Sequence, residues 1–149
     1  MLMAKHCVLL NAKKRQVCNM KEMIYQERLE KPIILDEGDF ENRHYCIISQ
    51  GTHPTAYISL TEQEIKQSAE YDDYNDKADV HGGFTYLGKA YWNKNDKRTY
   101  VGWDYAHYGD FTYGLFSIFQ WGEKYTTEFI LDEVKNAIKQ INKEQNNDK

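Results

Sequence analysis

The C-terminal part of the chain carries its clearest structural pattern. Apolar side chains recur there at three- or four-residue spacing, at Ile130, Leu131, Val134, Ala137, Ile138 and Ile141. This spacing predicts an amphipathic helix, which Thr126 or Thr127 can cap at its beginning. The apolar stripe must be buried against another layer of structure, most simply a sheet.

The middle of the chain predicts a sheet that can cover this stripe. Short apolar runs bounded by turn residues predict strands at 45–48, 56–60, 80–87 and 98–104. The first two runs, and likewise the last two, can pair as antiparallel hairpins. The aromatic segment 111–121 predicts another strand pair, bent at Gly114. The sequence therefore predicts an α+β fold, with a mainly antiparallel sheet and the C-terminal helix packed on one face.

Capping motifs predict two further helices. Thr61 and Glu64 have the spacing of a capping box and predict a short helix that ends near Ala69. The same spacing at the start of 19–30 predicts a helix over those residues. Between the predicted elements, the apolar run 33–35 is expected to end at the acidic residues that follow it, and the acidic, aromatic stretch after Ala69 is expected to be a surface loop.

Length and charge limit the organisation and the partners of the chain. Its 149 residues suit one domain. We expect a flexible N-terminal segment over 1–18, a single α+β domain over 19–142 and a polar tail over 143–149. A net charge of −4 offers no overall positive field for a nucleic-acid backbone. No run approaches the roughly 20 apolar residues of a membrane-spanning helix.

Cysteine and aromatic content add two expectations. The three cysteines, Cys7, Cys18 and Cys46, have unrelated spacing, which predicts reduced thiols and a cytoplasmic protein. Cys46 lies in an apolar strand and is predicted to be a buried thiol. Aromatic residues make up 14% of the chain. They suffice for a core and for either a ligand pocket or a homo-oligomer interface.

Two segments, His81–Gly88 and Val101–Asp110, concentrate the polar chemistry. In the first, a glycine pair beside the histidine permits a left-handed backbone or the close approach of a ligand, and equally a bulge or tight bend. In the second, Asp104, His107 and Asp110 follow a predicted strand at three-residue spacing. Pairing of the two strands would bring two imidazoles and two carboxylates into a small volume.

Three interpretations of these segments are open. In the first, His81, Asp104, His107 and Asp110 bind a divalent metal that activates water, although their spacing matches no standard zinc motif. In the second, the same groups hydrogen-bond a small ligand whose ring stacks on nearby aromatic side chains. In the third, His81 or His107 donates to Asp104 inside the fold and the aromatic residues are core.

The second interpretation predicts a nucleotide-like ligand, because bases stack on aromatic faces. The predicted ligand-binding residues are His81, Gly82, Gly83, Phe84, Tyr86, Arg98, Trp103, Asp104, His107 and Asp110. Phosphates would need basic partners, for which Lys89, Lys97 and Arg98 are the nearest in sequence. The sequence identifies no cofactor.

A single His-x-Thr motif, His53-x-Thr55, is the remaining chemical signal. Two-histidine phosphoesterases require this motif on two strands. The second residue after His81 is Gly83, so the second copy is missing and we discount this activity. His53-Pro54 is expected to form a turn.

The stretch from His53 to Asp110 resembles a family of small bacteriophage and prophage proteins. The resemblance rests on His53-Pro54, Tyr71-Asp72-Asp73, His81–Tyr86 and Gly102–Asp110. It covers about 60 of the 149 residues, and the combination is more specific than any of its parts. One departure is the predicted helix over 61–70, where the family is expected to have a glycine-containing loop.

The resemblance implies a viral accessory protein and carries no mechanism. Together with the residues above, it leads us to expect a protein that binds a small nucleotide-like signal molecule, without turning it over, to counter host defence. Two alternatives are a metal-dependent hydrolase that uses the His and Asp residues, and a direct protein inhibitor of a host enzyme.

Overall fold

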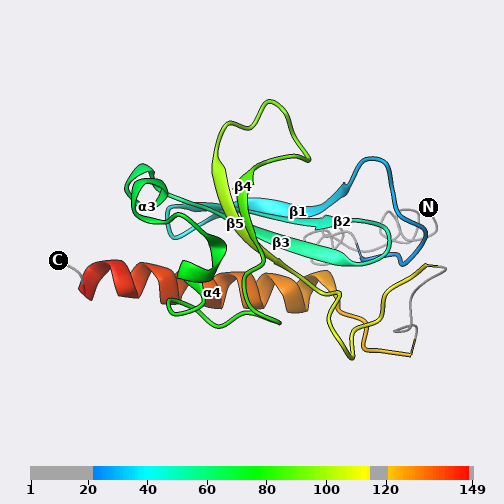
Figure 1. Cartoon of the computed structure of the whole chain (residues 1–149). Coiled ribbons are helices and arrows are strands. Elements are labelled where there is room, and N and C mark those ends of the chain that lie inside the picture. Colours follow the sequence, from blue (N-terminus) through cyan, green and yellow to red (C-terminus); the bar gives the residue numbers. More distant parts are fainter. Residues whose placement is uncertain (1–21, 115–120, 148–149) are drawn as a thin grey trace, which may run out of the picture.

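The computed structural model describes residues 22–114 and 121–147. They form a five-stranded antiparallel sheet with a long helix along one face (Figure 1). The strands are β1 (Ile33–Phe40), β2 (Arg43–Ser49), β3 (Pro54–Ser59), β4 (Tyr86–Lys89) and β5 (Thr99–Asp104), in the spatial order β1-β2-β3-β5-β4. The helices are α3 (Glu62–Gln67), the 3-10 turn η1 (Tyr71–Tyr74) and α4 (Thr127–Asn147). The predicted α+β fold is confirmed.

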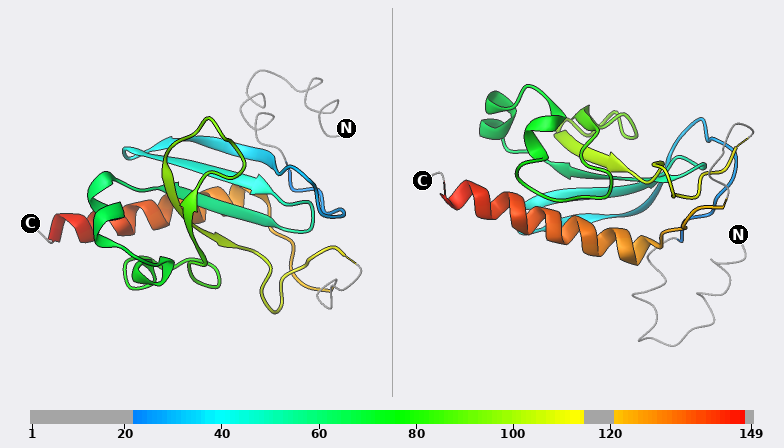
Figure 2. Two further views of the ribbon diagram at one scale, coloured as in Figure 1. Left: turned by 45° about the horizontal axis from the view of Figure 1, so that its top comes forward. Right: turned by 60° about the horizontal axis from the view of Figure 1, so that its bottom comes forward.

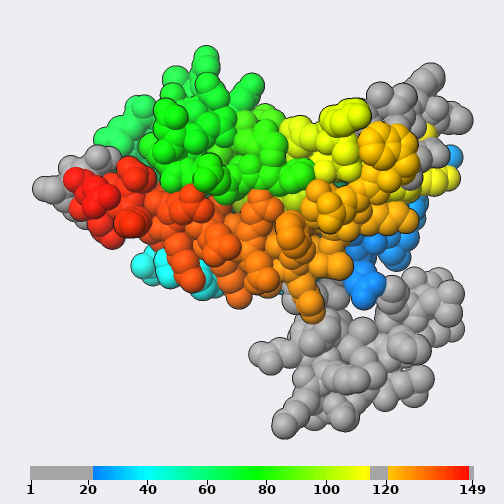
Figure 3. Space-filling model, turned by 90° about the horizontal axis from the view of Figure 1, so that it is seen from below, coloured from blue at the N-terminus to red at the C-terminus, as the bar shows by residue number. Residues whose placement is uncertain are grey.

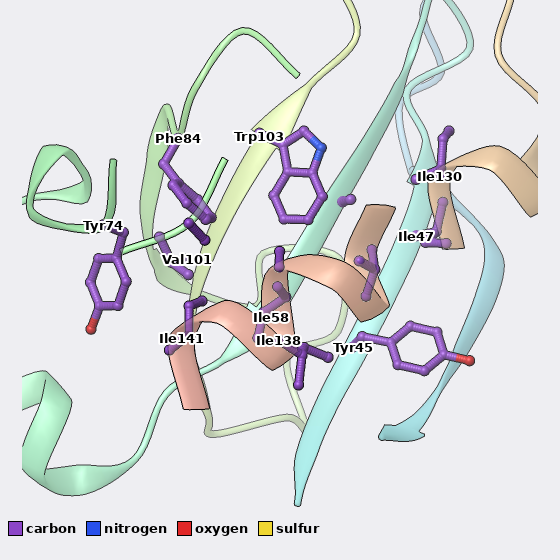
Figure 4. Close-up of a cluster of buried hydrophobic side chains, with 14 of the residues drawn as sticks. Tyr45, Ile47, Ile58, Tyr74, Phe84, Val101, Trp103, Ile130, Ile138 and Ile141 are labelled. Atoms are coloured by element: carbon purple, nitrogen blue, oxygen red, sulfur yellow. The ribbon is translucent and has the colours of Figure 1, made fainter. Parts of the chain in front are cut away.

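Helix α4 packs its apolar stripe against the sheet, as the sequence predicted. Ile130, Val134, Ala137, Ile138 and Ile141 are fully buried. They meet an apolar layer that includes Ile47, Ile58, Val101 and Trp103 (Figure 4). The helix runs along the length of the sheet (Figure 2) and forms one outer layer, with the segment that contains α3 and η1 along its side (Figure 3). It continues to Asn147, so 143–147, predicted as a polar tail, are helical.

The other face of the sheet carries a second, smaller apolar cluster, formed by Cys46, Ile48, Tyr57, Ala90 and Tyr100. The loop between β4 and β5 rises on this side, opposite α4 (Figure 1). The two faces therefore differ: one is closed by a helix, and the other is covered only in part by a loop.

Strand β1 corrects one prediction. The acidic residues 36–39 were expected to end the apolar run at Leu35, but the strand continues through them to Phe40. It lies at the edge of the sheet, where charged side chains reach solvent and discourage pairing with other chains. A two-residue turn, Glu41–Asn42, has positive φ at both positions and joins β1 to β2.

The predicted helix over 19–30 is wrong for the residues of it that the structure describes. Residues 22–30 are not helical. Their amides instead bond to the turn after β2, from Gln26 N to the Gly51 carbonyl (2.9 Å) and from Leu29 N to the Gln50 carbonyl (3.0 Å). Residues 19–21 and the N-terminal segment 1–18 lie outside the described residues.

Local motifs were predicted more accurately than the long loops. The capping box of Thr61 and Glu64 is present and opens α3. The predicted strand 80–87 shortens to β4, because a turn occupies 80–85. The aromatic stretch 111–121 lies partly outside the described residues, and 111–114 form no strand. No helix within 22–114 and 121–147 has the length and apolar character to cross a bilayer.

Candidate functional site

The two chemically rich segments lie side by side, as the sequence predicted. Strands β4 and β5 are antiparallel neighbours, and their pairing places Tyr86 opposite Gly102. The turn before β4 and the loop after β5 therefore meet at one end of the sheet. The ring centroids of His81 and His107 are 5.7 Å apart.

Asp110 is the centre of a saturated hydrogen-bond network at this end. Its carboxylate is buried and accepts three hydrogen bonds: from His81 Nε2 (2.7 Å), the backbone N–H of His107 (2.9 Å) and the Tyr125 hydroxyl (3.0 Å). Burial, together with the bond to Asp110, raises the pKa of Tyr125. Asp110 thus ties both segments to the start of α4.

The His81 residue is fixed from several sides. Its ring stacks on Tyr105 with centroids 4.9 Å apart and planes 11° apart. Its backbone N–H donates to Glu133 of α4, which also accepts from the Tyr105 hydroxyl (2.9 Å). The Tyr105 oxygen in turn accepts from Trp103 Nε1 (3.0 Å). The structural interpretation predicted that His81 or His107 donates to Asp104, whereas His81 bonds to Asp110.

Gly82 of the glycine pair serves the packing of His107, whereas Gly83 lies against Asn75. Gly82 and Gly83 both have left-handed backbone, with φ of +67° and +81°. A Cβ on Gly82 would lie 2.1 Å from His107 Nε2, so only glycine lets the imidazole rest on this turn. His107 Nε2 is buried and lies 3.4 Å from Asp104 Oδ1.

Asp104 belongs to a different environment from Asp110. In β5, Val101 and Trp103 point into the core under α4, so Gly102 and Asp104 point to the opposite face. The Asp104 carboxylate accepts from Ala106 N (3.0 Å) and from the Thr85 hydroxyl (3.1 Å). It is partly exposed and lines a hollow on that face.

This sheet hollow has a volume of about 230 Å³ and lies on the side of the sheet away from α4. The register of three neighbouring strands brings its lining residues together. Between β3 and β5, Thr55 is opposite Asp104 and Tyr57 is opposite Gly102. Between β5 and β4, Gly102 is opposite Tyr86. Its lining residues are Arg28, Gln50, His53, Thr55, Tyr57, Thr85, Tyr86, Tyr91, Trp103 and Asp104.

One buried polar group beside the sheet hollow is not used by the fold. Thr55 is 5% exposed, and its hydroxyl makes no hydrogen bond of normal geometry with any described residue. The His53 ring bonds through Nδ1 to the Thr52 hydroxyl (2.8 Å). Burial lowers the pKa of His53, which favours the neutral ring. Unused hydrogen-bonding capacity in a buried setting is unfavourable unless a ligand or water satisfies it.

The rim of the sheet hollow comes from two distant segments. The hydrogen bonds of 26–29 to the turn at Gly51 bring Arg28 to one side. Gly51 permits this approach, because a Cβ there would lie 2.3 Å from the Glu27 carbonyl oxygen. On another side, Tyr91 of the β4–β5 loop is held by hydrogen bonds of its hydroxyl with Tyr57 (2.6 Å) and Gln50.

The predicted ligand-binding residues fall into three groups. Tyr86, Asp104 and Trp103 line the sheet hollow, although Trp103 is 1% exposed and belongs to the core. His81, Gly82, Gly83, His107 and Asp110 form the network beside it.

Phe84 and Arg98 do not belong to either site. Phe84 is buried against Trp103, with ring centroids 5.5 Å apart, and has no face for a ligand. Arg98 bonds to Asp96 in the β4–β5 loop through Nε (2.9 Å) and NH2 (3.1 Å). The predicted stacking role of Phe84 and the predicted phosphate-binding role of Arg98 are therefore replaced by structural ones.

Sequence reasoning missed Arg28, Gln50, Tyr57, Thr85 and Tyr91, and set His53 and Thr55 aside. The one available signal was the alternation of Thr55 and Tyr57 in β3, which places both on the face opposite to Ala56. Cys46 was predicted correctly: burial raises the pKa of its thiol to about 12.

The donor groups at this end of the sheet contact one another rather than an empty centre. Among residues 22–114 and 121–147, no three His, Cys, Asp or Glu side chains are grouped so that they could hold a metal ion. Comparison with known protein families, with characterised proteins and with solved structures found no match.

Proposed function

We propose that the chain binds a small nucleotide-like molecule in the sheet hollow. The observation that carries the proposal is the buried hydroxyl of Thr55, a residue that lines the hollow; this hydroxyl makes no hydrogen bond of normal geometry with any described residue. A ligand that hydrogen-bonds this hydroxyl removes the unfavourable free energy of an unsatisfied buried group.

The remaining walls suit a heterocyclic base. Tyr86 and Tyr91 both line the hollow, and their rings pack edge-to-face with centroids 5.8 Å apart. The Asp104 carboxylate accepts N–H groups such as those of amino-substituted bases, while Arg28 can donate. A few convergent polar groups among aromatic rings are characteristic of small-molecule sites.

Binding without turnover is the part of the proposal supported by the neighbouring network. His81 and Asp110 are bonded to each other and to Tyr125 and Glu133, and neither residue lines the sheet hollow, so this pair would not act on a ligand bound there. Sequestration of a signal molecule to counter host defence is the biological role that we propose, and its support is the resemblance of His53–Asp110 to the phage family.

Isothermal titration with the four common ribonucleosides and their 5′-phosphates tests the proposal. Thr55→Val keeps the shape of the side chain and removes the hydroxyl. We expect it to weaken binding about tenfold, because a ligand group loses its partner. We expect the free energy of unfolding to stay equal or rise, because an unsatisfied polar atom is removed.

Thr99→Val is the matched control. Thr99 is also buried in the sheet. It lies two residues before Val101 in β5, so both side chains point to the face that α4 covers. Its replacement should leave affinity unchanged. If wild-type protein binds none of these compounds, or if both valine variants weaken binding equally, the sheet hollow is not the binding site.

A specific observation favours a second candidate, direct contact with a host protein. Tyr108 and Trp121 are 82% and 66% exposed, and their ring centroids are 5.8 Å apart. Exposed tyrosine and tryptophan are common at the centres of protein interfaces. Under this alternative, Tyr108→Ser with Trp121→Ser would abolish activity in a host-defence assay, whereas Thr55→Val would have no effect.

A further inference from the structure

A second hollow adjoins the sheet hollow. It has a volume of about 740 Å³ and shares Arg28, Gln50 and Tyr91 with its neighbour. Its full lining is Arg28, Leu29, Glu30, Lys31, Pro32, Gln50, Tyr91, Trp92 and Lys94. We call it the basic hollow. The shared residues make the two hollows neighbours, with Thr55 lining the first and Lys94 the second.

The charge of the basic hollow is opposite to that of the whole chain. Arg28, Lys31 and Lys94 contribute three positive charges against the one negative charge of Glu30, whereas the net charge of the chain is −4. None of these three cationic groups forms an ion pair or hydrogen bond with another described residue. Clustered cations without partners raise the local concentration of anions and stabilise them when bound.

The basic side chains suggested by the sequence are occupied elsewhere. Lys89 Nζ donates to the Lys97 carbonyl (2.9 Å), and Lys97 Nζ donates to the Lys94 carbonyl (3.1 Å). Arg98 bonds to Asp96. These contacts hold the β4–β5 loop in shape, and Lys94 of this loop lines the basic hollow.

An aromatic wall joins the two hollows. Trp92 packs on Tyr57 with ring centroids 4.2 Å apart, and Tyr91 packs on Trp92 at 5.2 Å. The Tyr91 hydroxyl is fixed by Tyr57 and Gln50. A rigid wall of this kind requires little ordering when a ligand binds.

The volumes indicate how a ligand would divide between the hollows. Sites for drug-sized molecules usually occupy about 300–1,000 Å³. The sheet hollow, at about 230 Å³, is below this range and suits a single ring system. The larger, basic hollow would receive the rest of the molecule.

We infer that the ligand is a nucleotide with at least two phosphate groups, whose base occupies the sheet hollow and whose phosphates lie between Arg28, Lys31 and Lys94. This inference rests on the proposed function and adds the charge of the ligand to it. Arg28, which lines both hollows, contacts the phosphate nearest the sugar.

A titration series tests the inference. Each ribonucleoside that binds is compared with its 5′-monophosphate and 5′-diphosphate at low and high salt. We expect the diphosphate to bind at least tenfold more tightly than the nucleoside at low salt, because each added phosphate forms charge-assisted hydrogen bonds. The difference should shrink at high salt, because the basic hollow is open to solvent.

The double variant Lys31→Gln/Lys94→Gln should remove most of the preference for the diphosphate and leave nucleoside binding unchanged. The control is Lys66→Gln/Lys143→Gln, which changes the net charge equally on α3 and α4. It should retain the preference.

The two proposals fail in different ways. If a nucleoside and its diphosphate bind equally, and Thr55→Val still weakens both, the inference about phosphates is wrong and the sheet hollow remains the site. If both lysine double variants lose the preference equally, the preference for the diphosphate comes from the overall charge of the protein and not from the basic hollow. If no compound in the series binds, the proposed function itself fails.

Discussion

Replacing Asp110 by asparagine tests whether the His81–Asp110 network is structural. The substitution keeps the size of the side chain but removes its charge. Hydrogen bonds to a charged acceptor are about twice as strong as neutral ones, a difference of roughly 1 kcal/mol per bond. Asp110 accepts three such bonds in a buried position. We therefore expect Asp110→Asn to lower the free energy of unfolding by about 3 kcal/mol.

Urea denaturation, followed by far-UV circular dichroism at pH 7, measures this loss. Asp104→Asn is the matched control from the same segment. Asp104 accepts two bonds and is partly exposed, so water can compensate, and we expect a loss of about 1 kcal/mol or less. Nucleotide binding should show the reverse order, with Asp104→Asn the more harmful change. A stable Asp110→Asn protein that no longer binds nucleotide would refute this division of roles.

Four further predictions concern stability and titration. Gly82→Ala should destabilise the fold by more than about 1 kcal/mol in the same assay, because a Cβ there collides with His107 and the residue has positive φ. Glu64→Gln should cost about 3–5 kcal/mol, because it leaves the buried Arg43 guanidinium without its charged partner. Burial alone would raise the pKa of Glu64, but the bond to Arg43 lowers it below 4.5. The free energy of unfolding of the wild-type protein should therefore fall as the pH drops through 4.5. An unchanged free energy of unfolding at pH 3.5 would contradict this. NMR titration should place the pKa of His53 below 6.5, and a higher value would show that the ring is not desolvated.

The parts of the fold that the sequence predicted are those governed by local rules. The stripe of α4 has helical periodicity, and the Thr61–Glu64 capping box is a contact between near neighbours. The apolar β2 and β3 likewise show their strand character directly.

The errors arose where distant contacts override local preference. Acidic residues of β1 remain in a strand because β2 supplies hydrogen bonds along one side and water covers the other. Residues 22–30 have a helical pattern, but two of their amides bond to carbonyls at Gln50 and Gly51 instead. Neither outcome can be deduced from the segment alone.

The candidate site was predicted only in part, because most of its residues are brought together by distant contacts. The convergence of His81 with His107 follows from the pairing of two neighbouring strands, which sequence analysis anticipated. The sheet hollow is lined by residues as far apart as Arg28 and Asp104, and only the tertiary fold brings them together. The sequence also gave no means of separating Asp104 from Asp110, because their roles depend on which face each carboxylate occupies.

Mapping of backbone amide chemical shifts on addition of a nucleoside 5′-diphosphate tests the central claim most directly. The account predicts the largest shifts at Arg28, Thr55, Tyr86, Tyr91 and Asp104, which surround the sheet hollow on the face away from α4. Shifts centred on Gly109 and Tyr125 instead, with those five amides unmoved, would place the ligand in the network and contradict the account.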